Sequence, residues 1–237
     1  MKIKNKIIIV TGASAGIGLA TAKLLSSKGA KVALVARSKD RLDALAKELP
    51  NSLAVVADMS KISSIDSMIK TVKEHYGAID ILINNAGQGI YGAVENVNIE
   101  NYKKVIDLNV IGVLEAMQKV IPIMRGQGGG MIVNISSMVS KAYYPFLGSY
   151  ASTKYALNAL SLTARAELEK ENIIVSVVHP GLTETDFGKN AIKSDETAKT
   201  MSSRSREGMP KPDSAEYVAE RILSAIETGK AETYAHE

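Results

Sequence analysis

The fold of this chain is decided by the stretch Lys6-Ile7-Ile8-Ile9-Val10-Thr11-Gly12-Ala13-Ser14-Ala15-Gly16-Ile17-Gly18. The β-branched run at residues 6–10 predicts a short buried strand, and residues 19–28 predict a helix. The glycines therefore lie in a turn between a strand and a helix, which is the setting of a dinucleotide site. Such glycines let the backbone approach a pyrophosphate, and the first amides of the helix favour its negative charge. A simple glycine-rich turn is the alternative.

The alternation of apolar runs and amphipathic segments continues along the chain. Further strands are predicted at residues 31–36, 53–57, 79–83, 131–135, 173–178 and 232–235, and helices at 40–49, 62–75, 99–125, from 151 onward and at 214–228. Strands that alternate with helices form βαβ crossovers in a parallel sheet with both faces covered. The 237 residues, 46% of them hydrophobic, suffice for one such core. We therefore expect a doubly wound, Rossmann-like α/β fold with three αβα layers, as one domain over residues 1–237.

Composition excludes several classes of protein. The chain has no cysteine, which rules out disulfides and thiolate chemistry and fits a cytoplasmic protein. Its three histidines are scattered, so no metal site is expected. The apolar run behind the basic N-terminal residues is too short for a signal peptide, and no run is long enough to span a membrane. The net charge of +4 is spread along the sequence, so nucleic acid is not an expected partner.

Residues at the carboxyl ends of the second and third strands face the expected adenosine site. Arg37 and Ser38 follow the second strand, where an arginine accommodates the 2′-phosphate of NADP(H). An ordinary exposed loop arginine is the alternative. Asp58 follows the third strand and can either contact the adenine edge or cap the helix that begins near Ser60.

Asparagines mark two later positions. Asn84-Asn85-Ala86-Gly87 ends the fourth strand and suits a tight corner whose amides bridge neighbouring strands. Asn109 lies within the long helix predicted at residues 99–125. An asparagine there is either exposed or marks a kink where another group enters the helical hydrogen-bond ladder.

Tyr150 and Lys154 are four residues apart at the start of a helix, so their side chains project side by side. An ammonium near a phenol favours the phenolate and lowers the phenol's pKa, which makes tyrosine a usable acid or base. An exposed Tyr beside a solvated Lys is the alternative. Ser137 ends the fifth strand and faces the same edge of the sheet, but no histidine and acid follow in the order of a serine hydrolase.

The segment at residues 186–212 follows His179-Pro180-Gly181, carries several lysines and arginines, and has little apolar periodicity. A loop of this length in a compact domain is often an active-site lid. We therefore expect it to cover the substrate.

Together these features resemble the short-chain dehydrogenase/reductase family over essentially the whole chain. The matching residues, in the family's order, are Thr11 to Gly18, Asp58, Asn84 to Gly87, Asn109, Ser137, Tyr150, Lys154, Pro180, Gly181 and Thr185. Their joint occurrence is far more specific than any single motif, and it favours catalysis by Tyr150.

The resemblance implies a role for each matching residue. Tyr150 would be the acid/base, Lys154 would bind the nicotinamide ribose and lower the Tyr150 pKa, Ser137 would hold the substrate oxygen, and Asn109 would hold a proton-relaying water. The residues implied to bind the cofactor are Gly12, Ser14, Ala15, Gly16, Ile17, Gly18, Arg37, Ser38, Asp58, Asn85, Ala86, Gly87, Tyr150, Lys154, Pro180, Gly181, Thr183 and Thr185.

Two features of the sequence depart from relatives of this family. NADP-preferring members often also carry a basic residue in the glycine turn, where this chain has Ser14-Ala15. Members resembling fatty-acid 3-oxoacyl reductases end in a longer strand than residues 232–235. We expect NADP(H) rather than NAD(H), and a partly hydrophobic carbonyl or alcohol, because the expected pocket edges are mostly apolar. Those edges are Gln88, Ile90, Met138, Tyr144 and Phe146.

Other functions remain open at this point. A nucleotide-binding sensor without turnover needs the cleft but not the full Tyr-Lys-Ser-Asn set, and an NAD-preferring dehydrogenase shares all of it. An epimerase or dehydratase of this fold has a larger substrate domain than the chain can hold. The resemblance also implies a homodimer or homotetramer.

Overall fold

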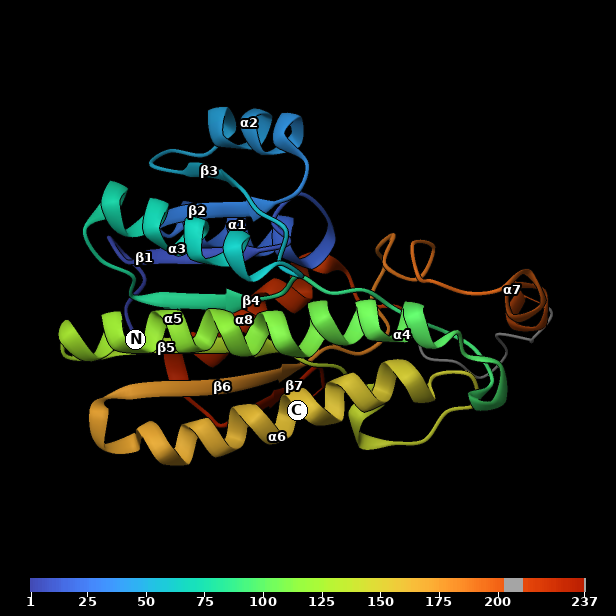
Figure 1. Cartoon of the computed structure of the whole chain (residues 1–237). Coiled ribbons are helices and arrows are strands. Elements are labelled where there is room, and N and C mark those ends of the chain that lie inside the picture. The colour runs from blue at the N-terminus through green and yellow to red at the C-terminus, as the bar shows by residue number, and fades with distance from the viewer. Residues whose placement is uncertain (203–210, 237) are drawn as a thin grey trace.

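The computed structural model of the protein describes residues 1–202 and 211–236 (Figure 1). Seven strands form a single parallel sheet in the order β3-β2-β1-β4-β5-β6-β7. The strands are β1 (Ile7–Thr11), β2 (Lys31–Ala36), β3 (Leu53–Val56), β4 (Ile81–Asn84), β5 (Gly130–Ile135), β6 (Ile173–His179) and β7 (Glu232–Tyr234). Parallel neighbours require crossover connections, which the intervening helices supply. The predicted doubly wound α/β fold is confirmed.

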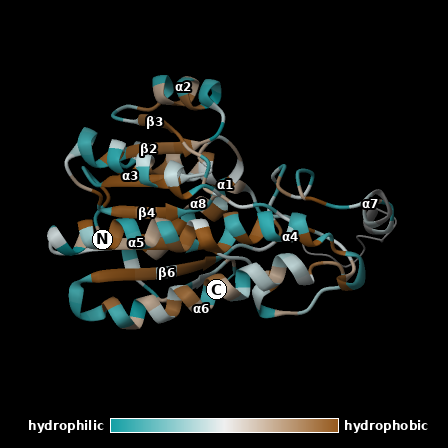
Figure 2. Ribbon diagram, in the orientation of Figure 1, coloured by the Kyte–Doolittle hydropathy of each residue, from teal (hydrophilic) through white to brown (hydrophobic). Residues whose placement is uncertain are grey.

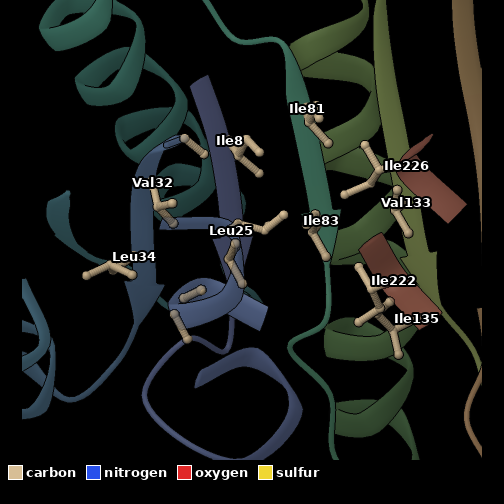
Figure 3. Close-up of a cluster of buried hydrophobic side chains, with 14 of the residues drawn as sticks. Ile8, Leu25, Val32, Leu34, Ile81, Ile83, Val133, Ile135, Ile222 and Ile226 are labelled. Carbon is tan, nitrogen blue, oxygen red and sulfur yellow. The ribbon is translucent and has the colours of Figure 1, made fainter. Parts of the chain in front are cut away.

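Helices cover both faces of the sheet. Helices α1 (Gly16–Ser27), α2 (Lys39–Glu48) and α8 (Ala215–Thr228) pack on one face, and α3 (Ile62–Tyr76), α5 (Gly112–Gly126) and α6 (Gly148–Leu168) pack on the other. The central strands β1, β4, β5 and β6 are mostly apolar because both of their faces are buried (Figure 2). Figure 3 shows part of the core between the sheet and helices α1 and α8, in which Leu25 of α1 lies near Ile8 and Ile83, and Ile222 and Ile226 of α8 lie beside Ile135 and Val133.

Several element boundaries differ from those predicted; helix α1, for example, begins at Gly16 and not at residue 19. Helix α6 begins at Gly148, so Tyr150 lies in its first turn. Strand β4 begins at Ile81 and not at residue 79, because Asp80 is engaged with β1. Its carboxylate accepts hydrogen bonds from the Ile7 amide at 2.8 Å and from Lys6 Nζ at 2.7 Å. Asp80, which directly precedes β4, therefore joins the amino ends of β1 and β4.

The long helix predicted at residues 99–125 is interrupted. It consists of α4 (Ile99–Ile106), a π-helical segment η2 (Asp107–Ile111) and α5. A π segment adds a residue to one turn and is common at functional sites. Asn109 lies in η2 and is only 1% exposed. Of the two alternatives for Asn109, an exposed side chain or an irregularity in the helix, the structure shows the second.

The segment that follows β6 extends past the carboxyl ends of the strands, as does the start of α4 (Figure 1). It contains a helix that the sequence did not predict, α7 (Asp195–Ser202). Two isolated parallel bridges, Ile90 to Ile192 and Thr183 to Asp213, attach the segment to the rest of the fold. The predicted lid at residues 186–212 includes 203–210, with Arg204 and Arg206, which lie outside the described residues.

In the part of the chain that the structure describes, every helix is too short or too polar to cross a bilayer.

The first residue of α5 offers a test of this packing. A Cβ added to Gly112 would lie 1.9 Å from the carbonyl oxygen of Met59, in the turn after β3. Although alanine is the better helix former by about 1 kcal/mol, we expect Gly112→Ala to lower the free energy of unfolding by roughly 1–3 kcal/mol. Thermal denaturation measures this change.

Gly126→Ala on the same helix is the matched control, since no atom lies within 4 Å of its added Cβ. This variant should be neutral or slightly more stable. If Gly112→Ala were as stable as Gly126→Ala, helix α5 would not pack against the Met59 turn as described.

Candidate active site

A hydrogen-bonded corner joins the carboxyl ends of β1 and β4. Thr11 Oγ1 donates to the Ile83 carbonyl at 3.2 Å and accepts from the amides of Asn85 at 2.9 Å and Ala86 at 3.0 Å. Asn85 Nδ2 in turn donates to the Thr11 carbonyl at 2.8 Å. The chain reverses its winding direction between these two strands, and open α/β sheets bind their ligands at such a point.

Asn84 bridges to the next strand. Its Nδ2 donates to Asn134 Oδ1 on β5 at 2.8 Å, and Asn134 Nδ2 donates to Ser161 Oγ on α6 at 2.7 Å. The prediction that the amides of this corner bridge neighbouring strands is confirmed for both asparagines. The bridge fixes β4, β5 and α6 relative to one another, beneath the site.

The glycine turn leaves a helix N-terminus open. Gly12 and Gly16 have φ angles of +70° and +51°, which favour glycine, and a Cβ on Gly18 would lie 2.2 Å from the Gly12 carbonyl oxygen. The N-cap residue of α1, Ala15, provides no side-chain cap, and the first turn has no acidic residue. Unpaired amides in this position fit the pyrophosphate of a dinucleotide. Ser14 and Ile17, also predicted to bind the cofactor, belong to the same turn.

The predicted adenosine end lies at the ends of β2 and β3, which the Ala57 amide joins by donating to the Ala36 carbonyl at 3.0 Å. Asp58 Oδ1 accepts from the amide of Ser60 at 3.0 Å and its hydroxyl at 2.7 Å, so Asp58 caps the turn before α3. Partial burial raises the pKa of Asp58, but the Ser60 hydrogen bonds and the charge of nearby Arg37 outweigh burial and lower it.

Arg37 is exposed, and the Ser38 side chain makes no capping hydrogen bond to α2. Both residues therefore remain accessible to a phosphate at this end of the site.

Lys154 is a buried lysine held by the sheet. It is 5% exposed, and its Nζ donates to the carbonyl of Ile135, the last residue of β5, at 2.8 Å. Nζ also lies 5.8 Å from the centroid of the Tyr150 ring, so the two side chains are neighbours as predicted. Burial lowers the pKa of Lys154 to about 8, because the charged ammonium is disfavoured away from water.

Tyr150 is 7% exposed and lies in the first turn of α6. Burial raises the pKa of its phenol, Tyr91 raises it further, and a hydrogen bond with Ser137 acts in the opposite direction. The prediction that Lys154 lowers the Tyr150 pKa is wrong for this structure, since burial dominates and the ammonium is directed to Ile135. A phenol in this state is a proton donor.

Asn109 uses its side chain to hold a turn of backbone. Oδ1 accepts from the Gln88 amide at 2.9 Å, while Nδ2 donates to the Gln88 carbonyl at 2.9 Å and to Thr153 Oγ1 at 3.2 Å. A Cβ on Gly87 would lie 3.3 Å from Asn109 Oδ1 and 3.9 Å from Lys154 Nζ. The π-helical segment is therefore joined to the loop after β4 and to α6, next to Lys154.

Two aromatic residues that the sequence did not single out enclose Tyr150. Tyr91 meets its ring edge-on, with centroids 6.3 Å apart, and Phe187 meets it at a tilt, with centroids 5.6 Å apart. The loop of Tyr91 and the segment of Phe187 are joined by the bridge between Ile90 and Ile192. Phe187 lies in the segment that the sequence predicts to be the lid, and this position is a signal that could have identified it.

The residues predicted to contact substrate are dispersed. The Gln88 side chain donates to the Asn190 carbonyl, so it ties the loop after β4 to the segment after β6. Met138 is 37% exposed and Tyr144 is 53% exposed, and the rings in contact with Tyr150 are Tyr91 and Phe187, not Tyr144. Phe146 adopts a φ of +70°, and its carbonyl accepts from the Gly92 amide at 2.9 Å.

The predicted nicotinamide end follows β6. The Pro180 carbonyl accepts from the Met138 amide at 2.9 Å, and Thr183 Oγ1 donates to the Gly181 carbonyl at 3.1 Å. Thr185 reaches the glycine turn, because a Cβ on Gly16 would lie 3.0 Å from its Cγ2. Thr185, in the segment after β6, thus lies against the turn after β1, at the expected position of the cofactor phosphates.

The same sequence matches a known family over most of its length. The family profile that matches residues 6–196 is described as short chain dehydrogenase. This chain belongs to the short-chain dehydrogenase family. It is accordingly an NAD(P)-dependent oxidoreductase that acts on CH–OH or C=O groups.

Three similar proteins illustrate the range of this short-chain dehydrogenase's relatives. A 3alpha-hydroxysteroid dehydrogenase of Mediterraneibacter gnavus is 38% identical over 193 residues, covering 79% of this chain and 77% of the relative. A 3-ketoacyl-(acyl-carrier-protein) reductase of Brucella melitensis, solved with NADH, has a TM-score of 0.86 at 26% identity and covers 99% and 98%. An alcohol dehydrogenase of Thermococcus sibiricus, solved with 5-hydroxy-NADP, has a TM-score of 0.84 at 28% identity and covers 98% and 96%.

Because Lys154 is buried, removing its charge should stabilise the fold and lower the activity. At pH 7 the fold holds a buried ammonium, so we expect Lys154→Met to raise the melting temperature by a few degrees, at roughly 2–4 °C per kcal/mol, while activity falls. Between pH 8 and 10.5 the folded wild type loses this proton while the unfolded chain keeps it. Wild-type stability therefore rises with pH, and the advantage of the variant should shrink.

Calorimetry at pH 7 and pH 10 measures both effects. Lys119→Met, which removes an exposed lysine paired with Asp66 and Glu115, is the control and should not be stabilised. A Lys154→Met variant that is less stable than wild type at pH 7 would contradict the burial of a charged amine.

Proposed function

We propose that this enzyme reduces a carbonyl group with NADPH, and that Tyr150 donates the proton to the forming alkoxide. The observation that carries the proposal is the environment of the phenol. Tyr150 is buried and protonated, hydrogen-bonded with Ser137 and adjacent to Lys154, at the carboxyl edge of the sheet. A pre-positioned acid of this kind typically accelerates a reaction by about 10²–10⁴-fold.

The residues present fit a nicotinamide dinucleotide. The open amides at the start of α1 would hold the pyrophosphate, with Asp58 near the adenine, Asn85, Ala86 and Gly87 along the cleft, and Lys154 at the nicotinamide ribose. Pro180, Gly181, Thr183 and Thr185 would hold the carboxamide end. When bound, this cofactor supplies the hydride for the carbonyl or accepts it from the alcohol.

The protein's own groups handle the proton. Tyr150 Oη donates it to the substrate oxygen, and the Ser137 hydroxyl holds the same oxygen in place by a hydrogen bond. The neighbouring Lys154 ammonium returns a proton to the phenolate that remains. Asn109 supports the relay that returns a proton to Lys154, at the bulge where the long helix meets the site.

The surroundings of Tyr150 favour an apolar substrate. Tyr91 and Phe187 present ring faces and edges to the phenol, and buried Ile90 lies beside them. Such an enclosure excludes water and suits a ketone or secondary alcohol flanked by an aliphatic or alicyclic group. The segment at residues 186–212 serves as the lid, attached through the bridge between Ile90 and Ile192.

The preference for NADP(H) rests on Arg37 and Ser38. Arg37 is an exposed cation at the end of β2, and the Ser38 hydroxyl makes no capping bond, so both can contact a 2′-phosphate. An NAD-preferring enzyme is the second candidate, since a similar structure was solved with NADH. We further propose a cytoplasmic homodimer or homotetramer, which sedimentation at micromolar concentration tests.

Replacing the proton donor tests the reaction. We expect Tyr150→Phe to lower kcat for the best substrate of a ketone panel by at least roughly 100-fold, because general acid catalysis is lost. The NADPH dissociation constant should change little, since the cofactor contacts remain. Initial rates of NADPH oxidation and a binding titration measure the two quantities.

Tyr155→Phe, on the exposed face of the same helix, is the matched control and should retain full activity. If the Tyr150→Phe enzyme had wild-type turnover, Tyr150 would not be the proton donor. A wild-type protein that binds NADPH but reduces no ketone would support a sensor without turnover.

Charge reversal at the adenosine end tests the cofactor preference. Arg37→Asp should weaken NADPH binding by roughly 10-fold or more, because a charged hydrogen bond contributes about 1.5–3 kcal/mol, and should change NADH binding far less. Fluorescence titration with both cofactors measures this ratio. Lys47→Asp, at the opposite end of α2, controls for net charge. Equal losses for both cofactors would contradict a phosphate contact at Arg37.

A further inference from the structure

His179 is a fully buried histidine that the proposed chemistry does not use. It ends β6 and faces the short C-terminal strand β7. Its Nε2 lies 2.9 Å from Glu232 Oε1, and its ring stacks on Tyr234 with centroids 4.9 Å apart and planes 13° apart. Strand β7 therefore holds this imidazole by a hydrogen bond and by stacking.

The other side of the imidazole faces the turn that carries Ser137. Nδ1 lies 3.5 Å from Ser140 Oγ and within reach of the Ser137 carbonyl. Ser140 Oγ donates to that carbonyl at 2.6 Å and accepts from Asn158 Nδ2 of α6 at 2.9 Å. The backbone of Ser137 is thus fixed from behind by a group of buried polar side chains.

Lys141 provides a second contact between the Ser137 turn and Glu232 of β7. It is the last residue of the 3-10 turn η3 (Met138–Lys141), which Ser137 caps, and its Nζ lies 2.6 Å from Glu232 Oε1. The same carboxylate oxygen therefore contacts both His179 and Lys141. Strand β7 is connected to the Ser137 turn at two points, through the imidazole and through the ammonium.

We propose that His179 and Glu232 are positioning residues for Ser137, and that β7 uses them to set the Ser137 hydroxyl against Tyr150. The inference rests on the proposed role of Ser137 in holding the substrate oxygen. Ser137 is the second residue after β5, and the amides on either side of it, Ser136 and Met138, donate to the carbonyls of Val178 and Pro180. The contacts behind the Ser137 carbonyl add a constraint between these two bonds.

The charges around His179 determine its state. The titratable groups that face it are Glu232 and Tyr234 on β7 and Lys141 on η3. Burial and Lys141 lower its pKa, and these effects outweigh Glu232, which raises it. The imidazole is therefore neutral at neutral pH, and the carboxylate assigns the proton to Nε2. Nδ1 then carries no proton where it faces the Ser140 oxygen and the Ser137 carbonyl.

Protonation changes this contact. A second proton converts Nδ1 into a donor, opposite the Ser140 hydroxyl and the Ser137 carbonyl. Acidification below the ordinary histidine pKa of about 6.5 should therefore alter the Ser137 turn through His179.

A double-mutant cycle tests the proposal kinetically. His179→Gln and Glu232→Gln should each lower kcat for a ketone roughly tenfold, since small misplacements of a contacting group are costly, and leave KM for NADPH within twofold. In a Ser137→Ala background neither substitution should lower kcat further. The same fold loss in both backgrounds would show general structural damage and overturn the proposal.

Thr233→Val on β7 is the matched control. It removes a buried hydroxyl that has no hydrogen-bond partner, between Glu232 and Tyr234, and changes neither contact to His179. It should keep wild-type kcat. A loss equal to that of Glu232→Gln would mean that any change in β7 disturbs the site.

Nuclear magnetic resonance tests the contact without turnover. With ¹⁵N-labelled histidine, His179 should be the neutral Nε2–H tautomer at pH 7.5 and should titrate below the ordinary value of about 6.5. The Ser137 amide signal should shift with the same midpoint in the wild type and lose this shift in His179→Gln. An Nδ1–H tautomer, or a Ser137 amide shift that stays constant while His179 titrates, would overturn the proposal.

The two experiments separate the possible failures. If the wild type reduces no ketone, the proposed function fails, and the resonance measurement still decides whether His179 governs the Ser137 turn. If ketones are reduced but the cycle is additive, the function stands and the positioning role fails.

Discussion

The site depends on one hydrogen bond, from the buried ammonium of Lys154 to the carbonyl of Ile135 at 2.8 Å. It fastens the first turns of α6 to the carboxyl end of β5, so that Tyr150 on the helix and Ser137 after the strand face each other. Burying a lysine is unfavourable, and burial lowers its pKa to about 8. Strongly shifted groups of this kind concentrate at functional sites, which fits an amine kept for chemistry and not for stability.

Around this bond, the site is assembled from segments far apart in sequence. The π-helical segment at Asn109 holds the loop after β4 next to Lys154, and the hydrogen bonds of Thr11 fix the corner between β1 and β4. Strand β7 reaches the same site from behind through Glu232 and His179. Each of these contacts satisfies a buried polar group, so the loss of one leaves a neighbour unpaired. Hydrogen bonds between segments therefore hold these residues in place although they follow strand ends.

The elements that could be predicted from sequence are those set by local rules. Short apolar runs such as residues 32–36 predicted buried parallel strands, and Gly12, Gly16 and Gly18 predicted the tight passage from β1 into α1. The π segment at Asn109 could not be predicted, because it depends on contacts with the Gln88 backbone and Thr153. The pKa of Tyr150 was predicted in the wrong direction, because sequence spacing gives the distance to Lys154 but not the burial of the phenol. Tyr91 and Phe187 were missed, since only the folded loops bring their rings to Tyr150.

The central claim is that Tyr150 and Ser137 bind one substrate oxygen beside the nicotinamide ribose held by Lys154. A crystal structure of the complex with NADP⁺ and a non-reacting ketone tests it most directly. The account predicts the ketone oxygen within about 2.6–3.2 Å of both hydroxyl oxygens, with Lys154 Nζ at the ribose. A ketone oxygen bound away from both hydroxyls, with its carbonyl carbon next to the nicotinamide, would contradict it.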